Sequence, residues 1–392
     1  MLQITAHSGT FHSISRAAGA VSNLAGLFPA VAWLGYTASQ METIGFSALR
    51  RLPSTFLACF LAFTALSVAL SAQTVKTLRI YTIDVEGGQS TLLVAPSGES
   101  LLVDSGWPGF DSRDAARIQT AMKDAGVTRI DHLLTTHYHR DHVGGLPQLV
   151  AQVPVGEFLD HGPNREDSDV TRTDYGAYLK AIEGHARRTV HPGDTIHIPG
   201  LSIVVVAADG EHIAAIPGIA PAPNSACAAE QPWPDDPTEN ARSVGILLTY
   251  GRFRFLDLGD LTGAKEVALV CPNSPLPHVD LFLVSHHGIN KSNSAALIHA
   301  IHPRVAIMNN GARKGGSPEA WQTVHASPGL EDLYQLHTAE ASDAAHNSSE
   351  PLIANPVAAS DIGASFKVVA TANGSFSITN ARTSRTKSYL HE

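Results

Sequence analysis

Hydrophobic and polar positions change their pattern near residue 77. From there, short apolar runs of strand length alternate with segments whose apolar residues recur at helical spacing, and glycines separate many of them. In the first half, strands are predicted over 78–85, 90–95, 100–103 and 130–135, and helices over 113–125, 146–153 and 175–187. The three closely spaced strands at the start predict a meander, and Gly126 is expected to end the first helix.

The second half repeats this alternation. Strands are predicted over 195–198, 201–207, 243–250, 253–258, 281–284, 305–308, 366–370 and 375–378, and helices over 295–302, 319–324 and 330–336. Each half delivers polar residues at the ends of strands, so we expect a layered α/β sandwich. Residues 209–239 are rich in proline and alanine and lack periodicity. Loops of this length are functional lids or disordered segments, and both interpretations stay open.

The segment before residue 77 has the pattern of an export signal. Arg50 and Arg51 precede an apolar run over 55–70, and small residues at 69–72 offer a cleavage site. The run is short for a transmembrane helix. We therefore expect a periplasmic or secreted protein with no stable membrane anchor after cleavage; an uncleaved anchor is the alternative.

These patterns define the expected domain organisation. Residues 41–72 form the signal, and residues 77–380 form one α/β domain with a long loop at 209–239. Because a signal starts at the N-terminus, residues 1–40 are either a spurious extension ahead of Met41 or an unusually long leader.

Composition and charge restrict the classes of function. The chain has 392 residues, of which 44% are hydrophobic and 16% charged, so it is globular and can bury a substantial core. Its net charge of −9 becomes about −11 without residues 1–72, because three arginines and one glutamate are removed. Binding to long nucleic acids needs clustered Lys and Arg. We therefore expect a small-molecule substrate and no long nucleic acid; the sequence does not indicate an oligomeric state.

Cysteine usage also bears on the compartment. Cys59 would be removed with the signal, which leaves Cys227 and Cys271. In an oxidising compartment such a pair can form a disulfide. Two free buried thiols are the alternative.

The strongest chemical signal is the run HYHRDH at residues 137–142. Within six residues it supplies His137, His139, Asp141 and His142, directly after a predicted strand. Imidazole and carboxylate are ligands that zinc prefers, and four of them on one loop can reach two adjacent metal positions. A solvated polar loop is the alternative, but this density of ligands favours a metal centre.

Further ligands are expected at other strand ends. Asp260 follows the strand predicted over 253–258, and its two carboxylate oxygens can bridge two cations. His286 and His287 follow the strand predicted over 281–284. The sequence does not decide which of these two histidines binds metal.

Over about residues 78–312 the chain resembles the metallo-β-lactamase superfamily, and within it the hydrolase domain of bacterial competence DNA-uptake proteins. The motifs are DVEGGQS at 84–90, VDSG at 103–106, THYHRDHVGG at 136–145, NARS at 240–243, GD at 259–260 and SHHG at 285–288. The resemblance implies a four-layer αββα sandwich and a zinc-dependent hydrolase domain over 77–380.

The resemblance also implies roles for the candidate residues. His137 and His139 would serve one metal, Asp141 and His142 the other, Asp260 would bridge, His286 or His287 would complete the second position, and Asp104 would hold the ligand loop by hydrogen bonds. Many superfamily members have a third histidine where this chain has Asn240. Either Asn240 is a weak oxygen ligand or two histidines alone hold the first metal, so two Zn²⁺ per chain are expected, with one as the alternative.

The implied chemistry is hydrolysis of an ester-like bond. Zinc lowers the pKa of bound water and polarises the scissile group, and Asp141 or Asp260 would orient the hydroxide. Phosphodiesters, carboxylic esters and lactones are all candidates; the resemblance and the acidic charge together favour a small phosphodiester. Lys291, Arg313 and Lys314 are candidate phosphate-binding residues, with ordinary surface charge as the alternative.

Two other functions stay open. One is a non-catalytic metal-binding or ligand-sensing module of the cell envelope, which the missing third histidine favours. The other is a lactonase or true β-lactamase. Retention of the whole HYHRDH run together with Asp260 favours the hydrolase.

Overall fold

The computed structural model describes residues 76–357 and 362–391. Contacts divide the chain into two units, and the described residues belong to the second, Val75–Glu392. The expected leader at 1–40 and signal at 41–72 lie outside the described residues. Within the described ranges, no helix has the length and apolar character that crossing a bilayer requires.

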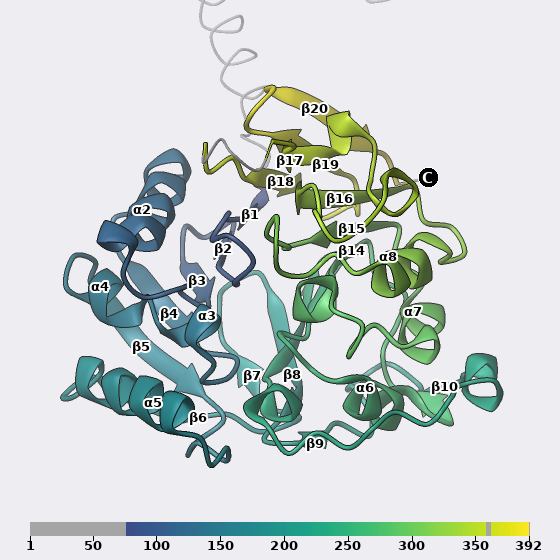
Figure 1. Ribbon diagram of the computed structural model, residues 1–392, viewed down its shortest axis with the longest axis horizontal. Coiled ribbons are helices and arrows are strands. Elements are labelled where there is room, and N and C mark those ends of the chain that lie inside the picture. Colours follow the sequence, from purple (N-terminus) through teal and green to yellow (C-terminus); the bar gives the residue numbers. More distant parts are fainter. Residues whose placement is uncertain (1–75, 358–361, 392) are drawn as a thin grey trace, which may run out of the picture. The chain divides into compact units, whose positions relative to one another are not determined.

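Two large sheets form the centre of the second unit (Figure 1). The strands of the first sheet are, in spatial order, β20 (Arg385–Tyr389), β19 (Phe376–Asn380), β18 (Phe366–Ala370), β1 (Leu78–Thr82), β2 (Thr91–Val94), β3 (Ser100–Val103), β4 (Ile130–Leu134), β5 (Val155–Asp160) and β6 (Ala186–Thr189). The predicted meander is confirmed, because β1, β2 and β3 pair antiparallel in sequence order. From β3 to β6 the pairing is parallel. The domain was predicted to end at residue 380, but β20 extends this sheet beyond that residue.

The second sheet faces the first. Its strands are, in spatial order, β17 (Ile353–Asn355), β16 (Asp332–His337), β15 (Val305–Met308), β14 (Leu281–Leu283), β12 (Phe253–Asp257), β11 (Gly245–Tyr250), β8 (Ser202–Ala208) and β7 (Thr195–Ile196), with β9 (Glu211–His212) paired to β8. Antiparallel hairpins join β7 to β8, β11 to β12 and β18 to β19. From β12 to β17 the strands run parallel, so their carboxyl ends lie at one edge of the sheet.

Helices cover the outer face of each sheet (Figure 1). The first sheet carries α2 (Arg113–Ala125), α4 (Leu146–Val150) and α5 (Asp169–Ala181); the second carries α6 (Gly263–Val270), α7 (Ala295–Ile301) and α8 (Pro318–His325). One apolar cluster lies between the sheets and one between each sheet and its helices. Leu78 and Ile80 pack between the sheets while Tyr81 packs toward α2, as the two-residue period of a strand requires. The αββα sandwich is thus confirmed.

Two helix predictions are wrong. The helix predicted over 175–187 lies earlier, at α5, and residues 186–189 form β6 instead. Ser168 begins α5, because its side chain accepts a hydrogen bond from the Thr171 amide. The helix predicted over 330–336 is strand β16, which lies between β15 and β17 with five of its six residues buried. A short apolar run does not distinguish a buried strand from a helix.

The long loop at 209–239 is fastened to the second helical layer. It contains β9, β10 (Ala222–Pro223) and a 3₁₀ turn, Ser225–Ala228. Of the two alternatives for the cysteines, the disulfide is present, between Cys227 in this turn and Cys271 at the end of α6. The Asn224 side chain also donates to the Val270 and Ala296 carbonyls, at 3.4 and 2.9 Å.

Candidate metal centre

The candidate ligands come from three strand ends. His137 and His139 follow β4, and Asp141 and His142 lie on a single helical turn, α3 (Arg140–Val143). Asp260 follows β12. The two remaining histidines lie in a 3₁₀ turn, Ser285–Gly288, directly after β14. The two sheets face each other, so these ends meet at one edge of the sandwich.

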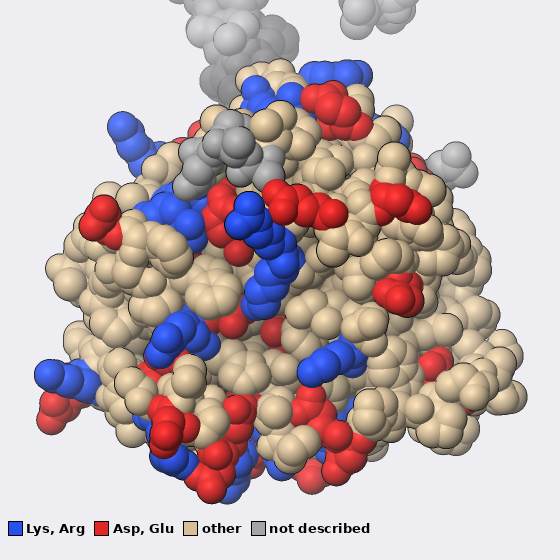
Figure 2. Space-filling view, in the orientation of Figure 1, with Lys and Arg blue, Asp and Glu red and all other residues tan. Residues whose placement is uncertain are grey.

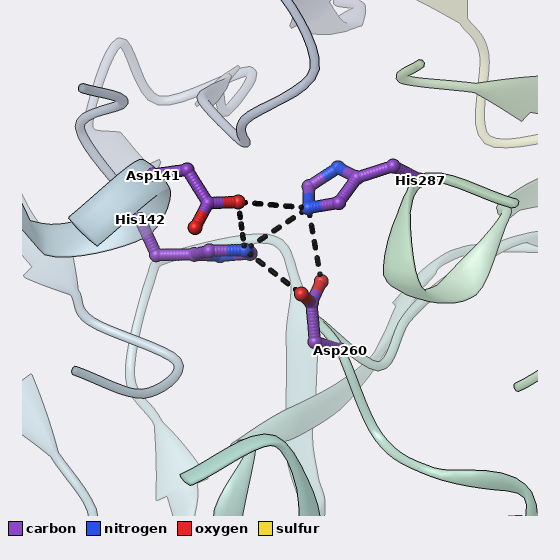
Figure 3. Close-up of side chains that lie close together, drawn as sticks. All are labelled: Asp141, His142, Asp260 and His287. Atoms are coloured by element: carbon purple, nitrogen blue, oxygen red, sulfur yellow. Dashed lines mark hydrogen bonds and ion pairs between the residues drawn. The ribbon is translucent and has the colours of Figure 1, made fainter. Parts of the chain in front are cut away.

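Four buried side chains converge on one point: Asp141, His142, Asp260 and His287 (Figure 3). One ligand atom from each lies within 4.8 Å of all the others. His142 Nε2 lies 3.2 Å from both Asp260 Oδ2 and His287 Nε2. His287 Nε2 lies 3.2 Å from Asp141 Oδ2 and 3.3 Å from Asp260 Oδ1. Of the two candidate histidines, His287 is therefore the one that joins Asp141 and His142.

This donor set fits a divalent metal ion. Two imidazoles and two carboxylates match the ligands of zinc. Buried polar atoms are normally satisfied, yet His137 Nε2 and Asp260 Oδ1 are buried here without a hydrogen-bond partner. Both atoms border the cluster, and a cation would satisfy them.

Asp104 fixes the orientation of His142. One carboxylate oxygen accepts a hydrogen bond from the Thr136 amide at 2.8 Å. The other accepts from Thr136 Oγ1 and from His142 Nδ1, both at 2.7 Å. Because a carboxylate only accepts hydrogen bonds, His142 Nδ1 carries a proton, and Nε2 is the ring nitrogen that faces the cluster.

The charged side chains of the cluster shift one another's pKa values. Burial would raise the pKa of Asp260, but His142 and His287 bring it well below its usual range. Burial likewise opposes ionisation of Asp141, and His142 and Lys314 bring its pKa well below the usual range. Burial would lower the pKa of His142, yet Asp260, Asp141 and Asp104 raise it well above its ordinary value. The carboxylates thus remain ionised, and His142 and Lys314 provide positive charge beside them.

His137 and His139 lie next to the four-residue cluster. His137 Nε2 is 3.9 Å from Asp260 Oδ2, and burial holds the pKa of His137 well below its ordinary value. The His139 ring stands edge-on to the His137 ring, with centroids 4.8 Å apart. His139 Nε2 hydrogen-bonds Glu166 Oε2 at 2.8 Å, so Nδ1 is its remaining ring nitrogen.

His286 lies on the other side of Asp260 from His287. Its Nε2 is 3.4 Å from Asp260 Oδ2 and 3.5 Å from Asn240 Nδ2. Burial lowers the pKa of His286 to about 4, so the ring is neutral at physiological pH, the form that binds metals.

Sequence reasoning missed two acidic residues that support the ligand loop. Glu166 holds His139 and also accepts the Glu239 amide at 3.1 Å. Glu239 is fully buried and accepts the Tyr138 amide at 3.3 Å, the Arg165 amide at 2.6 Å and His161 Nε2 at 2.9 Å. Glu166 lies in a loop and Glu239 begins a 3₁₀ turn, and no spacing or motif marked either residue.

The DVEGGQS motif supports the site without entering the cluster. Asp84 is buried and accepts hydrogen bonds from the Glu86 amide at 2.9 Å and Arg117 Nη1 at 3.2 Å. Gly88 lies so close to α3 that a Cβ there would be 2.4 Å from the Asp141 carbonyl oxygen. Glycine therefore lets this loop pack directly against the ligand-bearing turn.

The three predicted phosphate-binding cations lie in different places. Lys314 forms an ion pair with Asp141, and its Nζ is 5.1 Å from the centre of the Trp107 ring. Arg313 is largely exposed and pairs with Glu340 at 3.1 Å. Lys291 is exposed, and its carbonyl accepts the Gly263 amide. On the face drawn in Figure 2, basic and acidic side chains are mixed rather than gathered into one basic band.

Residues 84–219 match the family model described as the metallo-beta-lactamase superfamily. The resemblance to this superfamily that the motifs predict is thus confirmed.

Curated relatives match parts of the chain. A hydroxyacylglutathione hydrolase of Stenotrophomonas maltophilia is 40% identical over 91 residues, which are 23% of this chain and 32% of that protein. The atrochrysone carboxyl ACP thioesterase dmxR1 of a Cryptosporiopsis species is 30% identical over 111 residues, which are 26% of this chain and 33% of that protein. ComE operon protein 3 of Bacillus subtilis is 26% identical over 191 residues, which are 47% of this chain and 20% of that protein. This chain spans a third or less of the length of each.

The chain is also similar to a solved structure. The metallo-beta-lactamase fold protein YhfI of Bacillus subtilis aligns with 66% of this chain and 96% of its own, at 10% identity and a TM-score of 0.40.

Proposed function

We propose that the protein is a zinc-dependent hydrolase that cleaves an ester-like bond in a small molecule. The observation that carries this proposal is the buried convergence of Asp141, His142, Asp260 and His287 within 4.8 Å. Relatives named as a hydrolase and a thioesterase support it.

The residues have separate tasks in this proposal. When bound, zinc polarises the scissile group and lowers the pKa of water. Asp141, His142, Asp260 and His287 hold the ion, and Asp104 keeps the His142 proton on Nδ1. The carboxylates of Asp141 and Asp260 also accept hydrogen bonds from the attacking water and so orient it.

A small phosphodiester is the substrate class we propose first. The Lys314 side chain reaches the cluster and is partly exposed, so its ammonium group can leave Asp141 for an incoming anion once a metal neutralises that carboxylate. A phosphodiester carries one negative charge, which one lysine can pair. A thioester is the second candidate, because relatives carry the names thioesterase and hydroxyacylglutathione hydrolase.

A substrate comparison tests this proposal. Zinc-loaded full-length protein is assayed with bis-p-nitrophenyl phosphate and with a glutathione thioester. Lys314→Gln should raise KM for the phosphodiester about tenfold, or roughly 1.4 kcal/mol, and Lys291→Gln is the matched control that should leave it unchanged. Turnover of the thioester alone would overturn the phosphodiester assignment. If neither substrate is turned over after zinc or manganese is added, the hydrolase proposal fails and the non-catalytic metal-binding or ligand-sensing module becomes the favoured function.

We also propose that the protein is exported. The disulfide between Cys227 and Cys271 supports this, since disulfides persist mainly in oxidising compartments. Residues 41–72 would act as the signal, with no membrane anchor after cleavage. Cell fractionation combined with N-terminal sequencing tests this: a cytoplasmic protein that retains residues 41–72 would contradict it.

A further inference from the structure

Three histidines form a second group of imidazoles, away from the candidate metal centre. His278 precedes β14, His299 lies in the last turn of α7, and His302 follows α7 in a left-handed conformation with a φ angle of 39°. The ring centroids of His278 and His302 are 4.5 Å apart, and those of His299 and His302 are 5.1 Å apart. Two separate segments of the chain thus bring three imidazoles together, and we call this group the histidine cluster.

The histidine cluster lies at the opposite edge of the second sheet from the candidate metal centre. Strands β14 and β15 pair in parallel. His278 precedes β14 and His302 precedes β15, whereas His287 follows β14. Because the beginnings of parallel strands share one edge of a sheet and their ends share the other, a change in the histidine cluster leaves the strand-end ligands in place.

The spacing of the three rings suits a shared metal ion. A zinc ion lies about 2.0–2.1 Å from an imidazole nitrogen and so about 3 Å from the ring centre, which puts the centres of two tetrahedral ligands about 5 Å apart. The separations of 4.5 and 5.1 Å in the histidine cluster are close to this value. The rings of His142 and His287, which belong to the candidate metal centre, are also 5.1 Å apart.

The ring nitrogens of the histidine cluster are available to a ligand. Within the described part of the chain, no hydrogen bond to a ring nitrogen of His278, His299 or His302 is present. The three side chains line a surface cavity of about 190 Å³. Burial, together with His278 and His299, lowers the pKa of His302, which favours the neutral ring that binds metals.

Binding of one ion requires one ring to turn. The His278 and His302 rings are inclined by only 19°, so they are stacked and their nitrogens do not point at a common position. His278 is exposed, whereas His299 and His302 are half-buried. The His278 side chain can therefore rotate toward an ion that the other two histidines hold.

We propose that His278, His299 and His302 bind a divalent transition-metal ion at a surface site separate from the candidate metal centre. Imidazole is a suitable ligand for zinc, copper and nickel, and three imidazoles leave one position of a tetrahedral ion open. The nearby Arg304 pairs with Glu331 at 2.7 Å, so its positive charge is compensated. An ion at this site joins the segment before β14 to the end of α7.

Zinc and copper(II) binding by the full-length protein tests this proposal. Bound metal would be measured by elemental analysis after equilibrium dialysis, separately for each metal. For at least one metal, His278→Ala, His299→Ala and His302→Ala should each bind one ion fewer than the wild type, with affinity at this site weakened more than about 100-fold, beyond the loss expected for a supporting hydrogen bond. The triple variant should lose no further ion. His191→Ala, at an exposed histidine beside Asp194, is the matched control and should bind as the wild type does.

A further variant separates the two sites. His142→Ala removes a ligand of the candidate metal centre, so it should retain the ion of the histidine cluster, and adding His299→Ala should remove that ion. Near-UV circular dichroism would confirm that each variant is folded. Folded single variants of the histidine cluster that bind as much zinc and copper as the wild type would overturn the proposal, as would an equal loss in His191→Ala.

Discussion

Asp104→Asn is predicted to invert the protonation of His142 and so weaken metal binding with little change in shape. The asparagine oxygen can still accept the Thr136 amide, which lies 2.8 Å from Asp104 Oδ1. Its NH₂ group then replaces the oxygen that accepts from Thr136 Oγ1 and His142 Nδ1. The threonine hydroxyl can turn and accept, but His142 Nδ1 can accept only if the ring proton moves to Nε2. That proton occupies the lone pair that faces the metal position.

The expected magnitude follows from the role of Asp104. Loss of a partner that orients a metal-bound histidine costs about 10- to 100-fold in affinity, or roughly 1.4–2.8 kcal/mol. Zinc affinity would be measured by competition with a chromophoric chelator, with folding checked by near-UV circular dichroism. Asp174→Asn is the matched control, because Asp174 pairs with Arg140 in the same loop but contacts no ligand atom. Unchanged zinc affinity in folded Asp104→Asn would refute this reasoning.

Two further predictions concern stability. Burial raises the pKa of Glu266 to about 7, so the folded state takes up a proton there, and the stability this gives is lost as pH rises from about 4.5 to 7. The unfolding free energy measured with urea should fall by up to about 3 kcal/mol over this pH range because of Glu266, and Glu266→Gln should lack this contribution. Plots of unfolding free energy against pH that run parallel for the wild type and Glu266→Gln would contradict the prediction. Cys227→Ser removes a disulfide between residues 44 apart and should lower unfolding free energy by about 2–4 kcal/mol, whereas equal stability of reduced and oxidised wild type would argue against this.

Local signals explain which elements the sequence predicted well. Helix α2 begins and ends where predicted, because Gly126 adopts a φ of 70° and ends it. Strands β3 and β15 also have the predicted bounds, since both are short runs buried on all sides. Strand β16 was mistaken for a helix because its identity depends on its neighbours β15 and β17, which its own residues do not reveal.

The residues of the candidate site also differ in how well the sequence predicted them. Dense local patterns marked His137, His139, Asp141 and His142, and strand ends marked Asp260. The choice between His286 and His287 depends on positive φ angles, which are uncommon outside glycine and which no local pattern indicated. The support given by Glu166 and Glu239 depends on contacts between loops that are distant in sequence.

The most direct test of the metal centre is X-ray diffraction from zinc-loaded crystals, with data collected on both sides of the zinc absorption edge. The account predicts an anomalous peak between Asp141, His142, Asp260 and His287, about 2.0–2.1 Å from the Nε2 atom of each histidine. Folded, zinc-saturated protein with no anomalous density among these four residues would contradict it.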